Sequence, residues 1–227
     1  MQLSAPASLP LCVQHRHDPH GKRMKLRLFV LAVFATGSAR AECFNFSATT
    51  FQLLRERSSS RAVRGEAIWS DAGKLGNGRV WGAVRGVVAR PILELLKNLT
   101  AHTSTRNPRI SKMKIIDIED KNYLKHQKVR FEITPFPFIS VRWTEEWVFE
   151  LVRGQPTSPD IVVVSYEKTE GTSYIEHLCG NYVLEKEQFQ KTDVYIYEEA
   201  RATGRSEEDT LKDLSRTLES LRSTSMR

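Results

Sequence analysis

The chain has 227 residues, 40% of them hydrophobic, and its 34 Lys and Arg against 27 Asp and Glu give a net charge of +7. Residues 1–41 hold six of the basic residues and one acid, so the remaining 186 residues carry 28 basic and 26 acidic side chains, a net of +2. This near balance removes most of the case for nucleic-acid binding from bulk charge. A length of 186 residues predicts one domain with a sizeable core.

The N-terminal residues 1–41 are typical of an upstream extension followed by a secretory signal peptide. Met24–Arg27 is cationic, Leu28–Ala35 is an unbroken apolar run, and Ala39–Ala41 has the small-x-small pattern of a cleavage site. The apolar run is shorter than the roughly 20 residues that span a bilayer, which disfavours the alternative of a membrane-anchored N-terminus. We therefore expect a secreted or periplasmic protein.

Two cysteines remain after this cleavage, Cys43 and Cys179. In an oxidising compartment an even pair favours a disulfide, which would join the mature N-terminus to a strand. The alternative is a buried thiol at Cys179 and an exposed one at Cys43.

Alternating apolar and polar residues predict a series of strands after residue 78. Residues 42–78 are expected to form an N-terminal helix and loop, with a candidate short strand at 64–70. Seven main strands follow, at 79–89, 110–119, 123–134, 140–152, 161–167, 174–187 and 192–203.

Two helices are predicted around these strands. Pro91 suits a first helical turn, and apolar residues recur at helical spacing from Ile92 to Leu99. Ser206, followed by three acidic residues, predicts a capped helix start. The leucines of that last helix form one apolar stripe, at positions 211, 214, 218 and 221, which needs an apolar surface to cover.

Three local segments resemble the START-like (SRPBCC, helix-grip) superfamily. Val87–Leu96 resembles the first strand of the family and the helix after it, Asn107-Pro108 resembles its motif before the second strand, and Thr134–Arg142 resembles its PFP turn. The family usually has an acid after that arginine, where this chain has Trp143. The resemblance implies an α+β fold over 79–227, in which a curved antiparallel sheet of about seven strands grips a long C-terminal helix.

The family holds apolar ligands between the sheet and the last helix, and includes lipid carriers, coenzyme Q-binding proteins, hormone receptors and aromatic cyclases. The resemblance therefore implies a binding or transfer protein for a lipid or other hydrophobic small molecule. We expect a monomer with transient membrane contact, no cofactor and no metal. The candidate ligand-binding residues are Trp143, Glu145, Trp147, Phe149, Tyr182, Tyr195, Leu214 and Leu218.

Glu145 is the chemically notable member of this set, because it lies between two tryptophans on an otherwise aromatic strand face. If that face points inward, burial raises the pKa of the carboxyl, which could then act as an acid or bind a ligand head group. Alternatively, Glu145 pairs with Arg130 or Arg142. A second functional hypothesis is a cyclase or hydrolase that uses Glu145 and His177, and a third is a protein-interaction module whose cavity is filled by side chains.

Overall fold

The computed structural model describes residues 67–103, 110–136, 139–188 and 190–223, all of which belong to one compact unit, Ala39–Arg227. Within them lie eight strands, two α-helices and one short 3₁₀ turn. Their bounds are β1 Trp69–Lys74, η1 Gly76–Gly78, β2 Val80–Val88, α2 Ile92–Thr100, β3 Ile110–Asp117, β4 Lys125–Phe136, β5 Ile139–Gln155, β6 Ser158–Gly171, β7 Ile175–Gln188, β8 Lys191–Ala202 and α3 Glu207–Ser223.

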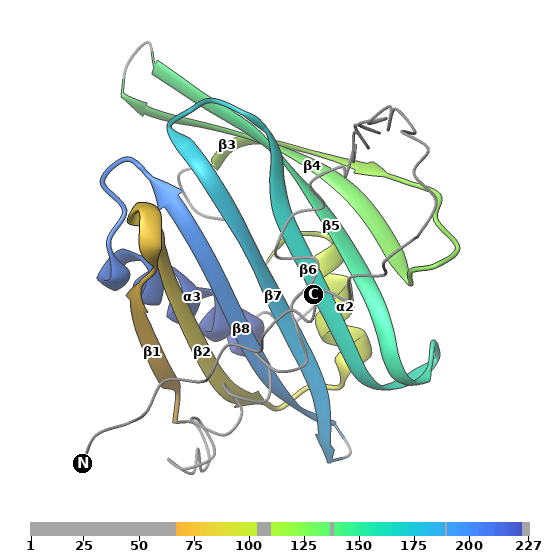
Figure 1. Ribbon diagram of the computed structural model, residues 1–227. Coiled ribbons are helices and arrows are strands. Elements are labelled where there is room, and N and C mark those ends of the chain that lie inside the picture. The colour runs from red at the N-terminus through yellow and green to blue at the C-terminus, as the bar shows by residue number, and fades with distance from the viewer. Residues whose placement is uncertain (1–66, 104–109, 137–138, 189, 224–227) are drawn as a thin grey trace, which may run out of the picture. The chain divides into compact units, whose positions relative to one another are not determined.

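All eight strands form a single curved antiparallel sheet in the order β1-β2-β8-β7-β6-β5-β4-β3 (Figure 1). Strands β3 to β8 are consecutive neighbours, so each turn between them is local along the chain. Among the described strands, the one pairing between segments distant in sequence brings β2 beside β8, with Val84 opposite Ile196. This arrangement confirms the predicted fold class.

Both helices cover the same, concave face of the sheet (Figure 1). Helix α2 contacts β6 and β7, whereas α3 contacts β1, β2 and β8. The leucine stripe of α3 faces this sheet as predicted, since Leu214, Leu218 and Leu221 are buried in the main core. None of the described helices is long and apolar enough to cross a membrane.

Close approach of α3 to β2 depends on two glycines on the concave face. A Cβ at Gly82 would lie 2.8 Å from Thr210 Cγ2, and one at Gly86 would lie 3.0 Å from Leu218 Cδ2. Side chains at either position would therefore push the helix off the sheet. The C-terminal end of α3 is also bonded to β2, because Arg222 Nε donates to the Val87 carbonyl oxygen at 3.1 Å.

The start of α3 carries the predicted capping arrangement. Ser206 Oγ accepts from the Asp209 N–H at 3.1 Å, and the Asp209 carboxylate accepts from the Ser206 N–H at 3.2 Å. Both backbone groups would otherwise lack a partner at a helix start. The hydrogen bonds of Ser206 hold the pKa of Asp209 below its ordinary value.

The sheet contains more strand than the sequence predicted. The candidate strand at 64–70 is displaced to β1, Trp69–Lys74, which pairs with β2 and adds an eighth strand before Arg79. The predicted loop between the fourth and fifth main strands is also shorter, because β5 runs to Gln155 and β6 begins at Ser158. Gly154 has a φ of 100°, a backbone conformation that glycine adopts without steric cost, and it allows this tight turn.

Candidate functional site

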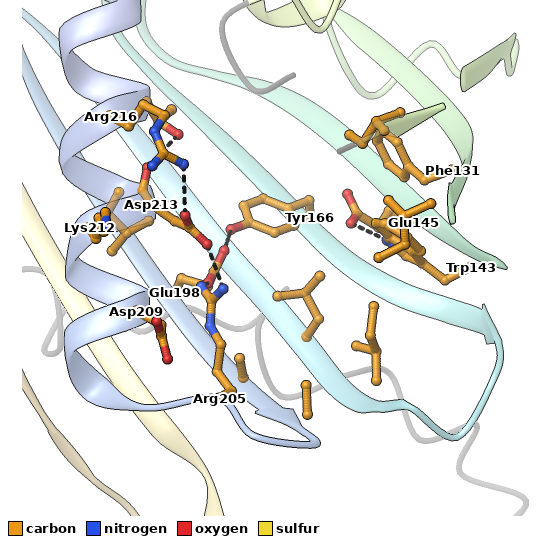
Figure 2. A pocket seen from close by; sticks show the side chains of 18 of the residues that line it. Phe131, Trp143, Glu145, Tyr166, Glu198, Arg205, Asp209, Lys212, Asp213 and Arg216 are labelled. Carbon is orange, nitrogen blue, oxygen red and sulfur yellow. Dashed lines mark hydrogen bonds and ion pairs between the residues drawn. The ribbon is translucent and has the colours of Figure 1, made fainter. Parts of the chain in front are cut away.

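A cavity of about 730 Å³ lies between the concave face of the sheet and α3. Its lining comes from β3 to β8, from the loop before α3, and from one face of that helix (Figure 2). The apolar and aromatic side chains of its wall include Ile110, Phe131, Ile133, Trp143, Leu178, Tyr182 and Leu214. Four acidic side chains also line the cavity: Glu145 and Glu198 from the sheet, and Asp209 and Asp213 from α3.

The Glu145 carboxylate is held by two indole groups on its own strand. Trp143 Nε1 donates to Oε1 at 2.6 Å, and Trp147 Nε1 donates to Oε2 at 2.9 Å. All three side chains lie on the concave face because residues two apart on a strand point the same way. Figure 2 shows the carboxylate directed toward the part of the cavity that Tyr166 and α3 border.

Glu145 is only 5% exposed and, among the residues that the structure describes, it has no ion-pair partner. The alternative pairing with Arg130 or Arg142 is therefore wrong, and Arg142 instead pairs with Glu132 at 3.1 Å. Burial raises the pKa of Glu145 to about 7, and the charge of Glu198 acts in the same direction. The two indole N–H groups oppose this rise, because they stabilise the ionised carboxylate.

Stacked aromatic rings surround this carboxyl group. Phe131 stacks on Trp143 with ring centroids 5.2 Å apart, and Trp147 stacks on Tyr166 at 4.4 Å. Tyr182 tilts against both Trp147 and Tyr166, with centroids 6.0 Å away. These rings supply flat apolar walls on one side of the cavity.

On the α3 side, the cavity is bordered by a chain of charged hydrogen bonds (Figure 2). Glu198 accepts from Tyr166 Oη and from Arg205 Nη2, both at 2.8 Å. Arg205 Nη1 donates to Asp213 at 2.6 Å, and Asp213 also accepts from Arg216 at 3.1 Å. This network joins β6, β8, the loop before α3 and α3 itself.

Burial raises the pKa of Glu198, although the Arg205 charge and the Tyr166 hydroxyl oppose the rise. Burial and the nearby Glu198 charge raise the pKa of Tyr166 well above its ordinary value, so this hydroxyl keeps its proton and donates it in a hydrogen bond. Sequence reasoning did not single out Glu198, Tyr166 or Arg205. The sequence offered only a weak signal for the two strand residues. Tyr166 lies two positions from Val164, and Glu198 lies two positions from Ile196, so each shares a strand face with an apolar residue.

A glycine on β7 makes room for Tyr166. A Cβ at Gly180 would lie 2.5 Å from the Tyr166 hydroxyl oxygen, so the ring can lie across the sheet toward Glu198 only because position 180 has no side chain. The hydrogen bond between Tyr166 and Glu198 therefore depends on this glycine.

Behind the aromatic wall, His102 is fully buried at the end of α2. Its ring meets Trp147 edge-on at 4.7 Å, and Nε2 lies 3.2 Å from Gln127 Oε1. Burial lowers the pKa of His102 to about 4, which keeps the ring neutral. The histidine thus supports Trp147 from the core side.

The structure brings most of the predicted ligand-binding residues together. Trp143, Glu145, Tyr182 and Leu214 line the cavity. Three other residues of the predicted set are not part of the cavity lining and are buried in the main hydrophobic cluster instead: Trp147, Phe149 and Leu218.

Tyr195 was assigned to the wrong face. Val194 and Ile196 point into the main core, so Tyr195 lies on the opposite face of β8, where the Arg85 guanidinium sits 4.6 Å from its ring centroid. Both faces of β8 are buried, so the alternation of apolar residues could not distinguish the inner face.

His177 also lies on the face opposite the cavity, beside Arg79, Glu176 and Arg201, whereas Glu145 faces inward. The proposed acid–base pair of Glu145 and His177 is therefore excluded. His177 Nε2 contacts Cys179 Sγ at 3.2 Å. Cys43 lies outside the described residues, so the Cys43–Cys179 disulfide stays a prediction.

Solved structures share this fold, and two of them illustrate the match. The human StarD13 (DLC2) lipid transfer and protein localization domain matches with a TM-score of 0.51 and 12% identity, covering 78% of this chain and 96% of that domain. A STAR-related lipid transfer protein from Xanthomonas axonopodis matches with a TM-score of 0.52 and 13% identity, covering 71% of this chain and 95% of the other. No protein-family model and no curated protein matches the sequence. The chain thus has the START-like helix-grip fold that its sequence predicted.

Proposed function

We propose that this START-like helix-grip protein binds, and transfers, a lipid or other hydrophobic small molecule in the cavity between its sheet and α3. The cavity itself carries the proposal. Its volume of about 730 Å³ lies within the roughly 300–1,000 Å³ of ligand pockets. A space of this size favours a bound ligand over the alternative of a protein-interaction module whose interior is filled by side chains.

Apolar burial would supply most of the binding free energy. Removing apolar surface from water contributes about 25 cal/mol per Å², and the rings of Phe131, Trp143 and Tyr182 offer flat surfaces against which an alkyl chain or ring system would pack. The names of the two matching structures, both lipid transfer proteins, are consistent with this use of the fold. Fold alone does not identify a ligand.

A secreted or periplasmic location is part of the proposal, and the signal-like segment within residues 24–41 supports it. A carrier in such an aqueous compartment would collect and release its ligand at a membrane. Tyr174, which lines the cavity and is 42% exposed, is a candidate for transient contact there. We expect the protein to act as a monomer.

Native mass spectrometry of the mature protein, purified from the compartment to which it is exported, tests the proposal. The expected result is an added mass that organic extraction removes, or that appears after incubation with a total lipid extract. A protein that emerges empty and takes up nothing from the extract would contradict ligand binding.

A further inference from the structure

The hydrogen-bonding groups of the cavity differ between its two sides, and the difference bears on which ligand fits. On the α3 side, every donor nitrogen of Arg205 already has an acceptor: Nε bonds Thr210 Oγ1 at 3.1 Å, Nη1 bonds Asp213, and Nη2 bonds Glu198. The Arg205 side chain is 22% exposed, and two carboxylates neutralise its charge. These bonds engage three of its five N–H groups, and its charge is balanced within the network before any ligand enters.

On the aromatic side, the cavity has spare acceptors. Each Glu145 oxygen accepts one indole N–H, and an ionised carboxylate oxygen can accept a second hydrogen bond. Tyr182 lines the same cavity at 3% exposure, and its hydroxyl, which can both accept and donate, has no hydrogen-bond partner among the described residues. A second buried acid, Glu198, stands across the cavity and makes a further negative charge there unfavourable.

From this asymmetry we propose that the cavity takes an apolar ligand whose buried end is a hydrogen-bond donor, an alcohol or an amine, and that Glu145 accepts from it. The inference rests on the proposed ligand-binding function and narrows its ligand class. A carboxylate or phosphate at the same place would face Glu145, which has no cationic partner among the described residues. The π faces of Trp143 and Phe131 beside the carboxyl group favour an ammonium for the same electrostatic reason.

The exposed cations of α3 do not reverse this preference. Lys212 is exposed, and Arg216, at 51% side-chain exposure, already pairs with Asp213. Both lie at the rim of the cavity, where water and salt screen their charges. They can attract an anion to the mouth, but they do not stabilise one that is buried beside Glu145.

The test compares three ligands with the same ten-carbon chain and different heads: decan-1-ol, decylamine and decanoate. Each displaces a neutral apolar fluorescent probe, diphenylhexatriene, from the protein at pH 8, above the pKa of about 7 of Glu145. We expect the alcohol and the amine to bind at least about tenfold more tightly than decanoate, the scale of one charge-assisted hydrogen bond.

Two variants assign the effect to the carboxyl group. Glu145→Gln keeps the shape and removes the charge, and it should weaken decylamine about tenfold or more while leaving decanoate unchanged or improved. Glu150→Gln, at an exposed position on the opposite face of the same strand, is the matched control and should change neither. The ratio of amine to alcohol affinity identifies which donor the site prefers.

The two failures are distinguishable. If diphenylhexatriene and all three ligands stay unbound, ligand binding itself is wrong, and this inference fails with it. If the probe binds but decanoate competes as well as decylamine, or Glu145→Gln leaves decylamine affinity unchanged, only the assignment of the ligand class is overturned.

Discussion

Trp147 Nε1 donates a hydrogen bond of 2.9 Å to Oε2 of Glu145, which lies two residues earlier on the same strand. The strand period places both side chains on the concave face, where the Trp143 indole binds the other carboxylate oxygen. A buried carboxyl group that lacks a cation among the described residues is thus stabilised by neutral donors only. Because its pKa is raised, the ionisation of this carboxyl group should be visible in how the stability of the protein depends on pH.

Glu145 should make the stability of the ligand-free protein fall as the pH rises toward neutrality. Its pKa is about 7 in the folded state against 4.5 ordinarily, so between these values the folded protein holds a proton that the unfolded chain has released. The contribution is fully present below pH 4.5, is lost as the pH rises to about 7, and amounts to about 3 kcal/mol. The free energy of unfolding in urea can be measured against pH for the wild type and for Glu145→Gln. The difference between the two should fall by this amount from pH 4.5 to about 7.

Other groups contribute to the wild-type curve but cancel in that difference. Burial also raises the pKa of Glu167 to about 7, whereas burial lowers that of His102 to about 4 and has the opposite effect on the pH slope. Glu150→Gln, at an exposed position of the same strand, is the matched control variant for this measurement. A Glu145→Gln curve parallel to that of the wild type would mean that the carboxyl group titrates normally.

Replacing Arg205 should destabilise the fold through the acids that it leaves behind. In Arg205→Met, Glu198 loses its cation while it remains 13% exposed, and a loss of about 2–4 kcal/mol in unfolding free energy is expected. The matched control is Arg216→Met, because that pair with Asp213 is half exposed, and its cost should stay below about 1 kcal/mol.

A second substitution separates the lost charge from lost packing. Adding Glu198→Gln to Arg205→Met removes the uncompensated carboxylate, so the double variant should be more stable than Arg205→Met alone. A double variant that loses the sum of the two single effects would show that the arginine acts through packing.

Gly82→Ala should loosen the grip of the sheet on α3. The new Cβ would lie 2.8 Å from the buried Thr210 side chain, so helix and strand must separate or distort, at a cost of about 1–3 kcal/mol in thermal or urea unfolding. Gly76→Ala, where nothing lies within 4 Å, is the control and should be nearly neutral. Equal behaviour of the two variants would contradict the close contact between β2 and α3.

Filling the cavity should abolish ligand uptake without unfolding the protein. Leu178 is half-buried and lines the cavity, so Leu178→Trp would place a larger side chain in its open volume. We expect the affinity for the probe to fall about tenfold or more, because the indole ring would occupy space in the cavity that the ligand needs. Leu93→Trp makes the same change at a 38% exposed position of α2 and should bind normally. Undiminished binding by Leu178→Trp would place the ligand elsewhere.

The sequence by itself determined the fold class and the inner face of β5. Trp143, Glu145 and Trp147 alternate with the polar residues Thr144 and Glu146 and so mark one face of the strand. The leucine spacing of the last helix requires an apolar surface to cover. Both patterns depend on the local period of a single element, 2 residues in a strand and 3.6 in a helix. They can therefore be read before any tertiary contact is known.

Only the tertiary structure decided which face of β8 points inward, and which groups meet across the cavity. Tyr195 was misplaced because both faces of that strand are buried, and burial on two sides erases the alternation that assigns a face. The network of Tyr166, Glu198 and Arg205 joins residues as far as 39 positions apart, through a sheet register and a glycine at position 180 that no local period encodes. These three side chains meet because β6, β7 and β8 are neighbours, and the order of strands is a property of the whole sheet.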